Sequence, residues 1–446
     1  MILPPQPPPP LQQFLDTLSW FLDRRHSELL EPLFVGLLLA HGRRTATAWF
    51  RAAAIADDFR RAYTLIGTIG RSKCDSGATV LFSQLSRTID PGPRWLFALD
   101  DTPTQRYGPC VEGAGIHHNP TPGPTHQRYV YGHVWVTLAW VVRHPLWHTV
   151  ALPLLADLYI RQVDLAKIDA DRRPDFATKL EWAARHLDWI AQQLRGTDRP
   201  IWFAVDGAYA KRPVLQAARQ VGVIVVSRLR HDAALRDVPA EVAAEQRGPG
   251  RPRRYGRHRI SLAKRAGHKQ GWQQVECFQY QHMATKTIKT FLATWKPAGG
   301  VIRVVVVKEE HDWRAYFCTD PEASVQDILE AAAGRTSIEQ TFKDVKEIEG
   351  AGEQQLRYWR ANVGAYHLCL WGYTAVEWWA WDKSTAQLCD RSASPWDQEE
   401  RRPSHADRRK ALQRELLERE FWRRWGERPC PPKIREIVDA MLAMAV

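Results

Sequence analysis

The chain has 446 residues, of which 44% are hydrophobic and 25% are charged, and its formal net charge is +12. This length is too great for one simple domain and predicts two to four, while the composition is that of an ordinary globular protein with ample material for a core. The positive charge favours a polyanionic partner, nucleic acid before a membrane surface, over the alternative of a generally basic proteome.

Cysteines and apolar stretches exclude several classes of protein. The seven cysteines stand singly without a CxxC pair, which excludes the usual zinc pattern and fits reduced thiols in a cytosolic protein. Residues 1–10, MILPPQPPPP, lack the layout of a signal peptide and are predicted to be a disordered Pro-rich tail. Residues 363–381 are the most apolar stretch but contain His367 and Glu377, so we expect a buried helix there and no membrane contact.

Apolar residues recur at helical spacing over residues 11–90. The stretch HGRRTATAWFRAA predicts a short turn between helices, with Thr45 or Thr47 as the helix cap. The arginines around this turn either face DNA phosphates or lie on a solvated helix face. We interpret residues 11–90 as a helical DNA-binding domain.

Residues 91–230 alternate between strand and helix patterns. The expected strands are residues 94–101, 129–142, 147–160, 201–205 and 221–229, and the expected helices are residues 174–195 and 211–221. This order predicts a mixed sheet, in which consecutive hairpin strands are followed by parallel strands joined through crossover helices. The first strand ends on Asp100 and Asp101, and the fourth ends on Asp206.

A basic segment interrupts this α/β pattern at residues 231–322. Residues 247–296 contain twelve Lys or Arg residues and a single acid, Glu276. The stretch RGPGRPRRYGRHRI is followed by three strand-like runs, GWQQVECFQYQH, VIRVVVVKEE and WRAYFCTD. A floppy basic loop would explain the composition, but the strand-like runs favour a β-rich insertion that binds DNA.

The remainder of the chain is predicted to be helical. Residues 323–382 contain a helix, a Gly-Arg break, a second helix capped near Thr336 or Ser337, and the apolar helix described above. We interpret these residues as the last part of the α/β core. Residues 383–446 form a charged helical tail that is a candidate for dimerisation.

Four acids stand where chemistry could use them: Asp100, Asp101, Asp206 and Glu339. If the first and fourth strands are neighbours, their carboxyl ends meet at one edge of the sheet, where ligands bind in such folds. Carboxylates gathered there repel one another, and a divalent cation with hard oxygen ligands, Mg²⁺ or Mn²⁺, relieves the repulsion. Alternatively each strand-end acid is a solvated turn residue, and Glu339 pairs with Lys343 on an exposed helix.

The motifs resemble those of insertion-sequence transposases of the DDE superfamily, whose catalytic core is similar to ribonuclease H. The resemblance covers roughly residues 30–380. LFALDDT, WFAVDGAY and FCTD look like the family's strand motifs. One branch of the family carries Tyr-x2-Arg-x3-Glu-x6-Lys, and Arg335, Glu339 and Lys346 fit these spacings, with Ala332 in the place of Tyr.

This resemblance implies an α/β fold: a ribonuclease H-like mixed-sheet core in two parts, residues 91–230 and 323–382, with an all-α N-terminal domain and a β-rich basic insertion. It implies a cut-and-paste DNA transposase that cleaves transposon ends and joins the 3′-hydroxyl to target DNA by two-metal catalysis. Asp206, Glu339 and one of Asp100 and Asp101 would hold two Mg²⁺, with Mn²⁺ as a substitute. Successive strand residues point to opposite faces, so only one of the two should bind metal. The motif D-x-T favours Asp100 and D-T favours Asp101, and we lean to Asp100.

Candidate DNA contacts come from Arg and Lys residues near these motifs and in the insertion. They are Arg106, Lys211, Arg251, Arg253, Arg254, Arg257, Arg335, Lys343 and Lys346. The expected partners are double-stranded DNA and a second copy of the chain on that DNA, in the prokaryotic cytoplasm at the nucleoid. Two alternatives remain: a DNA-binding protein derived from a transposase that has lost catalysis, or a structure-specific nuclease with the same core. His117 and His118, in the predicted loop after the first strand, are weaker candidates that we expect to face solvent.

Overall fold

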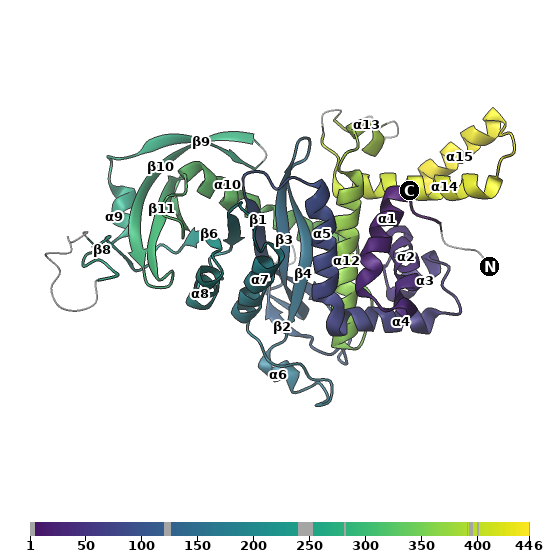
Figure 1. The fold of residues 1–446 in the computed structure, drawn as a ribbon, viewed down its shortest axis with the longest axis horizontal. Coiled ribbons are helices and arrows are strands. Elements are labelled where there is room, and N and C mark those ends of the chain that lie inside the picture. The colour runs from purple at the N-terminus through teal and green to yellow at the C-terminus, as the bar shows by residue number, and fades with distance from the viewer. Residues whose placement is uncertain are drawn as a thin grey trace.

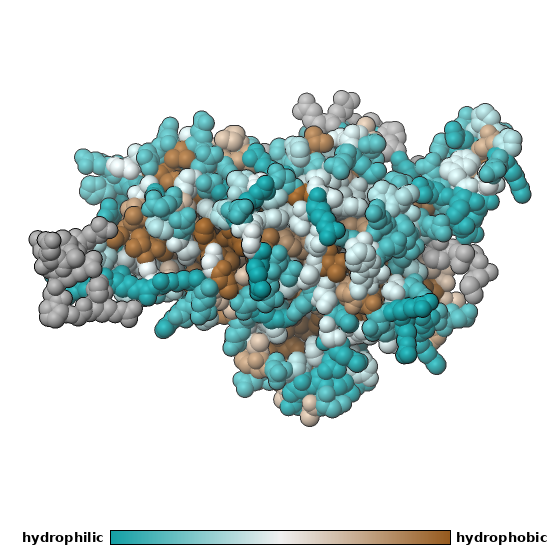
Figure 2. Space-filling model, viewed as in Figure 1, coloured by the Kyte–Doolittle hydropathy of each residue, from teal (hydrophilic) through white to brown (hydrophobic). Residues whose placement is uncertain are grey.

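The structure is a computed structural model that describes residues 5–119, 126–239, 253–280, 282–389, 391, 396–398 and 401–445. A long mixed sheet runs through the molecule, with the insertion at one end and helices from both termini at the other (Figure 1). Among the described residues no helix is both long and apolar enough to cross a membrane. Hydrophilic side chains cover most of the face seen in Figure 2.

The N-terminal part is helical. Its elements are α1 (Pro9–Leu18), the 3-10 turn η1 (Ser19–Phe21), α2 (Arg24–Leu39), α3 (Ala46–Ala52), α4 (Phe59–Thr68), the π-helical turn η2 (Ile69–Lys73) and α5 (Cys74–Thr88). Thr45 caps α3 by accepting a hydrogen bond from the Ala48 amide, so the predicted cap is confirmed. Residues 9 and 10, which we expected in the disordered tail, form the first turn of α1, because proline is compatible with a helix start.

Five strands form the first part of the core. They are β1 (Trp95–Gln105), β3 (Tyr129–His144), β4 (His148–Tyr159), β5 (Ile201–Val205) and β6 (Ile224–Leu229). The pairs β1–β3 and β3–β4 are antiparallel, whereas β5 runs parallel to β1 and β6 runs parallel to β5. The mixed sheet predicted from the sequence is therefore confirmed. It is compatible with the ribonuclease H-like fold of DDE enzymes.

Helices cover both faces of this sheet. Successive side chains of a strand point to opposite faces, so each strand contributes apolar residues to both helical layers. Ala98 and Trp202 pack toward α10 (Val325–Arg335) and α11 (Ser337–Glu347), whereas Phe97 and Phe203 belong to the main core on the other face. That core includes the crossover helices α7 (Lys179–Gln193) and α8 (Arg212–Gln220); a short helix, α6 (Gln162–Leu165), precedes them.

One local prediction was wrong. His117 and His118 lie on a short strand, β2 (Gly115–His118), that pairs with β3, because the chain returns alongside the long β3 instead of forming a free loop. The N-cap residue of α11 is Thr336, at the predicted position, but it makes no side-chain cap, since the hydroxyls of Thr336 and Ser337 donate backwards to carbonyls of α10. The break between the two helices is nevertheless present.

The basic insertion extends the core sheet. Its described elements are β7 (Leu235–Arg236), β8 (Arg259–Ile260), α9 (Leu262–Gly267), β9 (Gln273–Gln279), β10 (His282–Trp295), β11 (Gly300–Lys308) and β12 (Trp313–Cys318). β12 pairs antiparallel with β6, so hydrogen bonding continues from the core into the insertion. The strands join the described part of the insertion to the core sheet, as Figure 1 shows.

The long helix α12 (Trp359–Ala380) is buried along almost its whole length. It packs against β4 and against α1, α2, α4 and the tail helix α14 (His405–Trp425), and the indole of Trp371 donates a hydrogen bond to the Leu154 carbonyl. The most apolar stretch is thus a buried helix, as predicted. The remaining tail elements are α13 (Thr385–Leu388) and α15 (Pro432–Ala445).

Candidate active site

Asp100 and Asp206 lie beside each other on neighbouring strands. The β1–β5 pairing places Leu99 opposite Val205, and the two aspartates are the next residue along each strand. β1 does not end at its acids, as we had expected, but continues to Gln105 because β3 still pairs with it. The two carboxylates therefore stand where β1 and β5 part, an edge that is favourable for ligands in open α/β sheets.

Asp100 and Asp101 point to opposite faces of the sheet, because side chains alternate along a strand. Asp100 shares a face with Ala98, under α10 and α11. On the other face, Asp101 accepts a hydrogen bond of 2.7 Å from the Tyr209 hydroxyl and forms an ion pair of 2.6 Å with Lys179. Both oxygens of Asp101 are thus occupied by neighbouring side chains.

Arg335 connects Asp100 to Glu339. It is the last residue of α10, and Glu339 lies in the first turn of α11. One guanidinium nitrogen lies 2.7 Å from Asp100 Oδ2 and another lies 2.9 Å from Glu339 Oε1. The alternative pairing of Glu339 with Lys343 is not observed, and among the described residues the exposed Lys343 forms no ion pair.

The pKa of Asp100 is raised to about 6, mainly by burial and to a smaller extent by the neighbouring Asp101 and Asp206 carboxylates. Arg335 and the Asp101 amide, which donates to Asp100 Oδ1 at 2.9 Å, act in the opposite direction. For Arg335, burial lowers the pKa, but Asp100, Glu339 and Asp206 outweigh burial and raise it. Three carboxylates thus act on one guanidinium, and the site is short of positive charge.

This donor chemistry fits a hard divalent cation such as Mg²⁺, which prefers carboxylate oxygens. Within the ranges that the structure describes, no three His, Cys, Asp or Glu side chains are already gathered as metal ligands. The reason lies in the geometry above, since the guanidinium of Arg335 stands between Asp100 and Glu339. Two of these carboxylates, Asp100 and Glu339, bind Arg335, whereas Asp206 accepts a hydrogen bond from the Ala208 amide.

The predicted DNA contacts near the core fall into three kinds. Lys211, like Lys343, is exposed. Lys346 is half-buried and its amine donates to the Thr102 hydroxyl at 3.1 Å. Arg106 is buried and donates to the Gly352 carbonyl and to His133 Nδ1, and burial lowers its pKa to about 10. Since its hydrogen bonds point inward, Arg106 is not part of the DNA-binding surface proposed below.

The insertion exposes a run of cations. Arg251 lies outside the described residues. The described basic residues of the segment 253–269 are all exposed, and none forms an ion pair with another described residue; they are Arg253, Arg254, Arg257, Arg259, Lys264, Arg265 and Lys269. Arg259, Lys264 and Arg265 also line a groove of about 610 Å³. Charges left without carboxylate partners are available to a polyanion.

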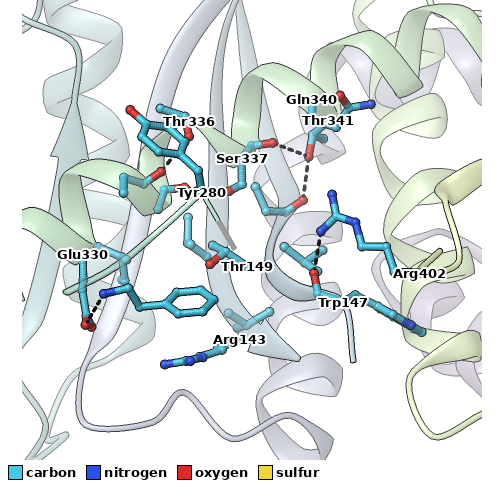
Figure 3. Close-up of a pocket in the computed structure, with 18 of the residues that line it drawn as sticks. Arg143, Trp147, Thr149, Tyr280, Glu330, Thr336, Ser337, Gln340, Thr341 and Arg402 are labelled. Atoms are coloured by element: carbon cyan, nitrogen blue, oxygen red, sulfur yellow. Dashed lines mark hydrogen bonds between the residues drawn. The ribbon is translucent and has the colours of Figure 1, made fainter. Parts of the chain in front are cut away.

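Another cavity of the molecule lies away from the acids. It has a volume of about 570 Å³ and lies between the β3–β4 turn, α10, α11 and the segment around Arg402 (Figure 3). Thr149, Ser337 and Gln340 line it, but Asp100, Asp206 and Glu339 do not.

Several residues of the site were missing from the sequence-based prediction. Lys179 and Tyr209 hold Asp101, and Thr102 holds Lys346. Tyr209 lies within the WFAVDGAY motif, so its place near Asp206 was a usable signal. Lys179 begins a helix far from either strand motif, and nothing in the sequence connected it to Asp101.

The mixed sheet, with acids from two neighbouring strands at one edge and a third acid on a covering helix, is compatible with the ribonuclease H-like fold of DDE nucleases. The model of the DDE superfamily endonuclease family matches residues 14–296, and the chain belongs to this family. The match includes Asp100, Asp101 and Asp206 and ends before Glu339. A search among curated proteins found no match.

Proposed function

We propose that the protein is a DNA transposase that cleaves phosphodiester bonds at transposon ends and joins the resulting 3′-hydroxyl to target DNA. The observation that carries this proposal is the meeting of Asp100 and Asp206 on β1 and β5, with Glu339 tied to them through Arg335. Membership of the DDE superfamily endonuclease family supports nuclease chemistry on DNA.

Asp100, Asp206 and Glu339 would hold the divalent cations, Mg²⁺ with Mn²⁺ as a substitute. When bound, such cations activate the attacking water or 3′-hydroxyl and stabilise the leaving oxygen of the phosphodiester. The inward-facing partners of Asp101 support Asp100 as the ligand from β1. Asp101 would instead fix the middle of β1 against α7 and the turn after β5 through Lys179 and Tyr209.

Two groups of cations would hold DNA. Near the acids, Lys343 and Lys211 are exposed and would contact backbone phosphates, while Arg335 and Lys346 lie directly beside the site. Further away, Arg253, Arg254 and Arg257 of the insertion would bind the transposon end, together with Arg251. The N-terminal helices, which lie at the other end of the sheet, would make a separate contact with transposon-end DNA. Two copies of the chain would act together because two DNA ends must be joined.

A joining assay tests the proposal against its alternatives. A plasmid that carries the reading frame with its flanking DNA is the donor, and a second, labelled plasmid is the target, in Mg²⁺ or Mn²⁺. We expect cleavage at both flanks and covalent transfer of a donor 3′ end into the target. Cleavage without a joined product would contradict the transposase and favour a structure-specific nuclease. Binding without cleavage in either metal would favour a DNA-binding protein that has lost catalysis.

A further inference from the structure

Arg335 occupies the place of a cation within the acid cluster. Its guanidinium makes two short ion pairs, with Asp100 on β1 and with Glu339 on α11, and it is also within the electrostatic reach of Asp206. The Arg335 side chain is only 17% exposed and Asp100 is 20% exposed. Arginine keeps its charge in proteins, so this positive group is permanent.

The Arg335 guanidinium can bind the two carboxylates or a DNA phosphate, but it cannot bind both at once. A divalent cation held by Asp100 and Glu339 needs the carboxylate oxygens that Arg335 now binds. A DNA phosphate offers two oxygens in a geometry that matches the guanidinium fork equally well. Glu339 is 59% exposed, so the outer end of the bridge is open to solvent and to a ligand that approaches from there.

We propose that Arg335 is an exchangeable counter-ion: it binds Asp100 and Glu339 in the metal-free protein and transfers to a DNA phosphate when a divalent cation takes its place. This inference rests on the proposed function, since it concerns the same site. It follows that Arg335 competes with metal while DNA is absent, and that metal and DNA strengthen each other's binding, because reciprocity of this kind is a thermodynamic necessity.

Lys343 provides the matched control. It lies on α11, one turn after Glu339, and it is exposed without an ion pair among the described residues. A substitution of Lys343 removes one positive charge from α11, the helix that carries Glu339. It frees neither the Asp100 nor the Glu339 carboxylate, because Lys343 is bound to neither. Lys343→Gln should therefore weaken DNA binding and leave the competition with metal unchanged.

The first experiment measures Mn²⁺ binding to the whole chain without DNA, by the electron paramagnetic resonance signal of free Mn²⁺ at pH 8. We expect Arg335→Gln to bind Mn²⁺ at least about fivefold more tightly than wild type, the lower end of typical coupling between sites. Lys343→Gln should match wild type. Arg335→Lys, which keeps the charge but loses the two-pronged grip, should lie between wild type and Arg335→Gln. Equal Mn²⁺ affinity in wild type and both Arg335 variants would overturn the proposal.

The second experiment measures the affinity for a labelled DNA duplex by fluorescence anisotropy, in Ca²⁺ and in K⁺ at equal ionic strength. Wild type and Lys343→Gln should gain DNA affinity from Ca²⁺, by about fivefold or more. Arg335→Gln should lose this gain, and an equal gain in all three proteins would overturn the exchange.

Asp206→Asn separates this inference from the proposed function. If the substitution abolishes Mn²⁺ binding while Arg335→Gln behaves as wild type, only the exchange proposal fails. If Asp206→Asn leaves Mn²⁺ binding intact, the acid cluster is not the metal site, and the proposed function fails together with the exchange.

Discussion

The insertion and the C-terminal tail are both rich in arginine, but their arginines have opposite surroundings. In the tail, Arg401 pairs with Asp397 and Asp407, and Arg408 pairs with Glu377. In the insertion, the cations of the segment 253–269 face solvent without a carboxylate partner among the described residues. An arginine with a carboxylate partner therefore stabilises the fold, whereas an arginine without one is available to DNA. The number of arginines in a region does not distinguish the two cases.

The acid site is a third case, in which carboxylates outnumber cations. Arg335 is shared by Asp100 and Glu339 and lies within reach of Asp206. A site short of positive charge is suited to a metal ion, just as a surface short of negative charge is suited to DNA. The tail arginines are compensated by carboxylates, the insertion leaves positive charge uncompensated, and the acid site leaves negative charge uncompensated.

The largest effect on stability is expected at the most deeply buried ion pairs of the tail. His405 on α14 lies between Glu349 and Glu377, at 2.9 and 2.6 Å, and all three side chains are buried. Burial lowers the pKa of His405, but the two hydrogen bonds outweigh burial and raise it. His405→Leu should cost about 3 to 5 kcal/mol in urea unfolding, because it leaves buried carboxylates without this partner. A cost below about 1 kcal/mol would contradict the structural role of the tail charges.

The same cluster predicts a pH dependence. Since the folded pKa of His405 is raised, its stabilising contribution is complete below the ordinary histidine value and is lost as pH rises through the folded pKa. The gap in melting temperature between wild type and His405→Leu should therefore narrow as the pH is raised from 6 upward, as thermal scans across that range would reveal. A gap that widens with pH would be inconsistent with a protonated His405.

In the insertion, the expected effect is on DNA and not on stability. The triple substitution of Arg253, Arg254 and Arg257 by Gln should lower DNA affinity by about 10-fold or more and reduce the salt dependence by roughly one unit of slope for each lost phosphate contact. Unfolding should change by about 0.5 kcal/mol or less, since these side chains are exposed. Filter binding over a range of salt concentrations measures both quantities. An unchanged salt slope would place the DNA elsewhere.

At the acid site, substitution should stabilise the metal-free protein. The pKa of Asp100 is raised to about 6, so its neutral form is favoured in the fold, and stability is lost as pH rises from its ordinary value through 6. Asp100→Asn should be more stable than wild type at pH 8 by roughly 1 to 3 kcal/mol, given about 1.4 kcal/mol for each pKa unit. Thermal melting in EDTA should show this gap widening from pH 5 to pH 8. If the difference in melting temperature between Asp100→Asn and wild type does not depend on pH, burial does not disfavour the ionised Asp100 carboxylate.

The smallest effect is expected at the exposed end of the tail. Arg423 and Arg424 pair with Glu420 within α14, at 2.9 and 2.5 Å, and both arginines are well exposed. Replacing both by Gln should change the free energy of unfolding by about 1 kcal/mol, because both arginines are exposed and Gln can still donate a hydrogen bond to Glu420, whose side chain is 10% exposed. DNA affinity should stay within about twofold of wild type in the same binding assay, since these charges already have a partner. A large loss of DNA affinity would erase the distinction between the two arginine-rich regions.

Much of the core could be predicted because its signals are local. The apolar run before Asp206 predicted β5, and the order of strands and helices predicted the mixed sheet. The choice between Asp100 and Asp101 could not be made from the sequence, since it depends on Lys179, Tyr209 and Arg335, which are far away in the chain.

The errors have the same origin. Arg106 follows the first acid motif in sequence, but β1 continues and turns its side chain into the interior, where it meets Gly352. The histidines of β2 became part of a strand because β3 is long enough to pair with them. The pairing of the tail with Glu349 and Glu377 joins distant segments, and no spacing rule predicts it.

The proposed function requires that Asp100, Asp206 and Glu339 form a metal-dependent site for cutting DNA. The most direct test measures cleavage of the flanking DNA in Mn²⁺ by wild type, by Asp206→Asn and by Asp232→Asn, an exposed acid paired with Arg230 that serves as the control. We predict that Asp206→Asn abolishes cleavage while it retains DNA binding, and that Asp232→Asn cuts like wild type. Cleavage by Asp206→Asn at the wild-type rate would contradict the claim.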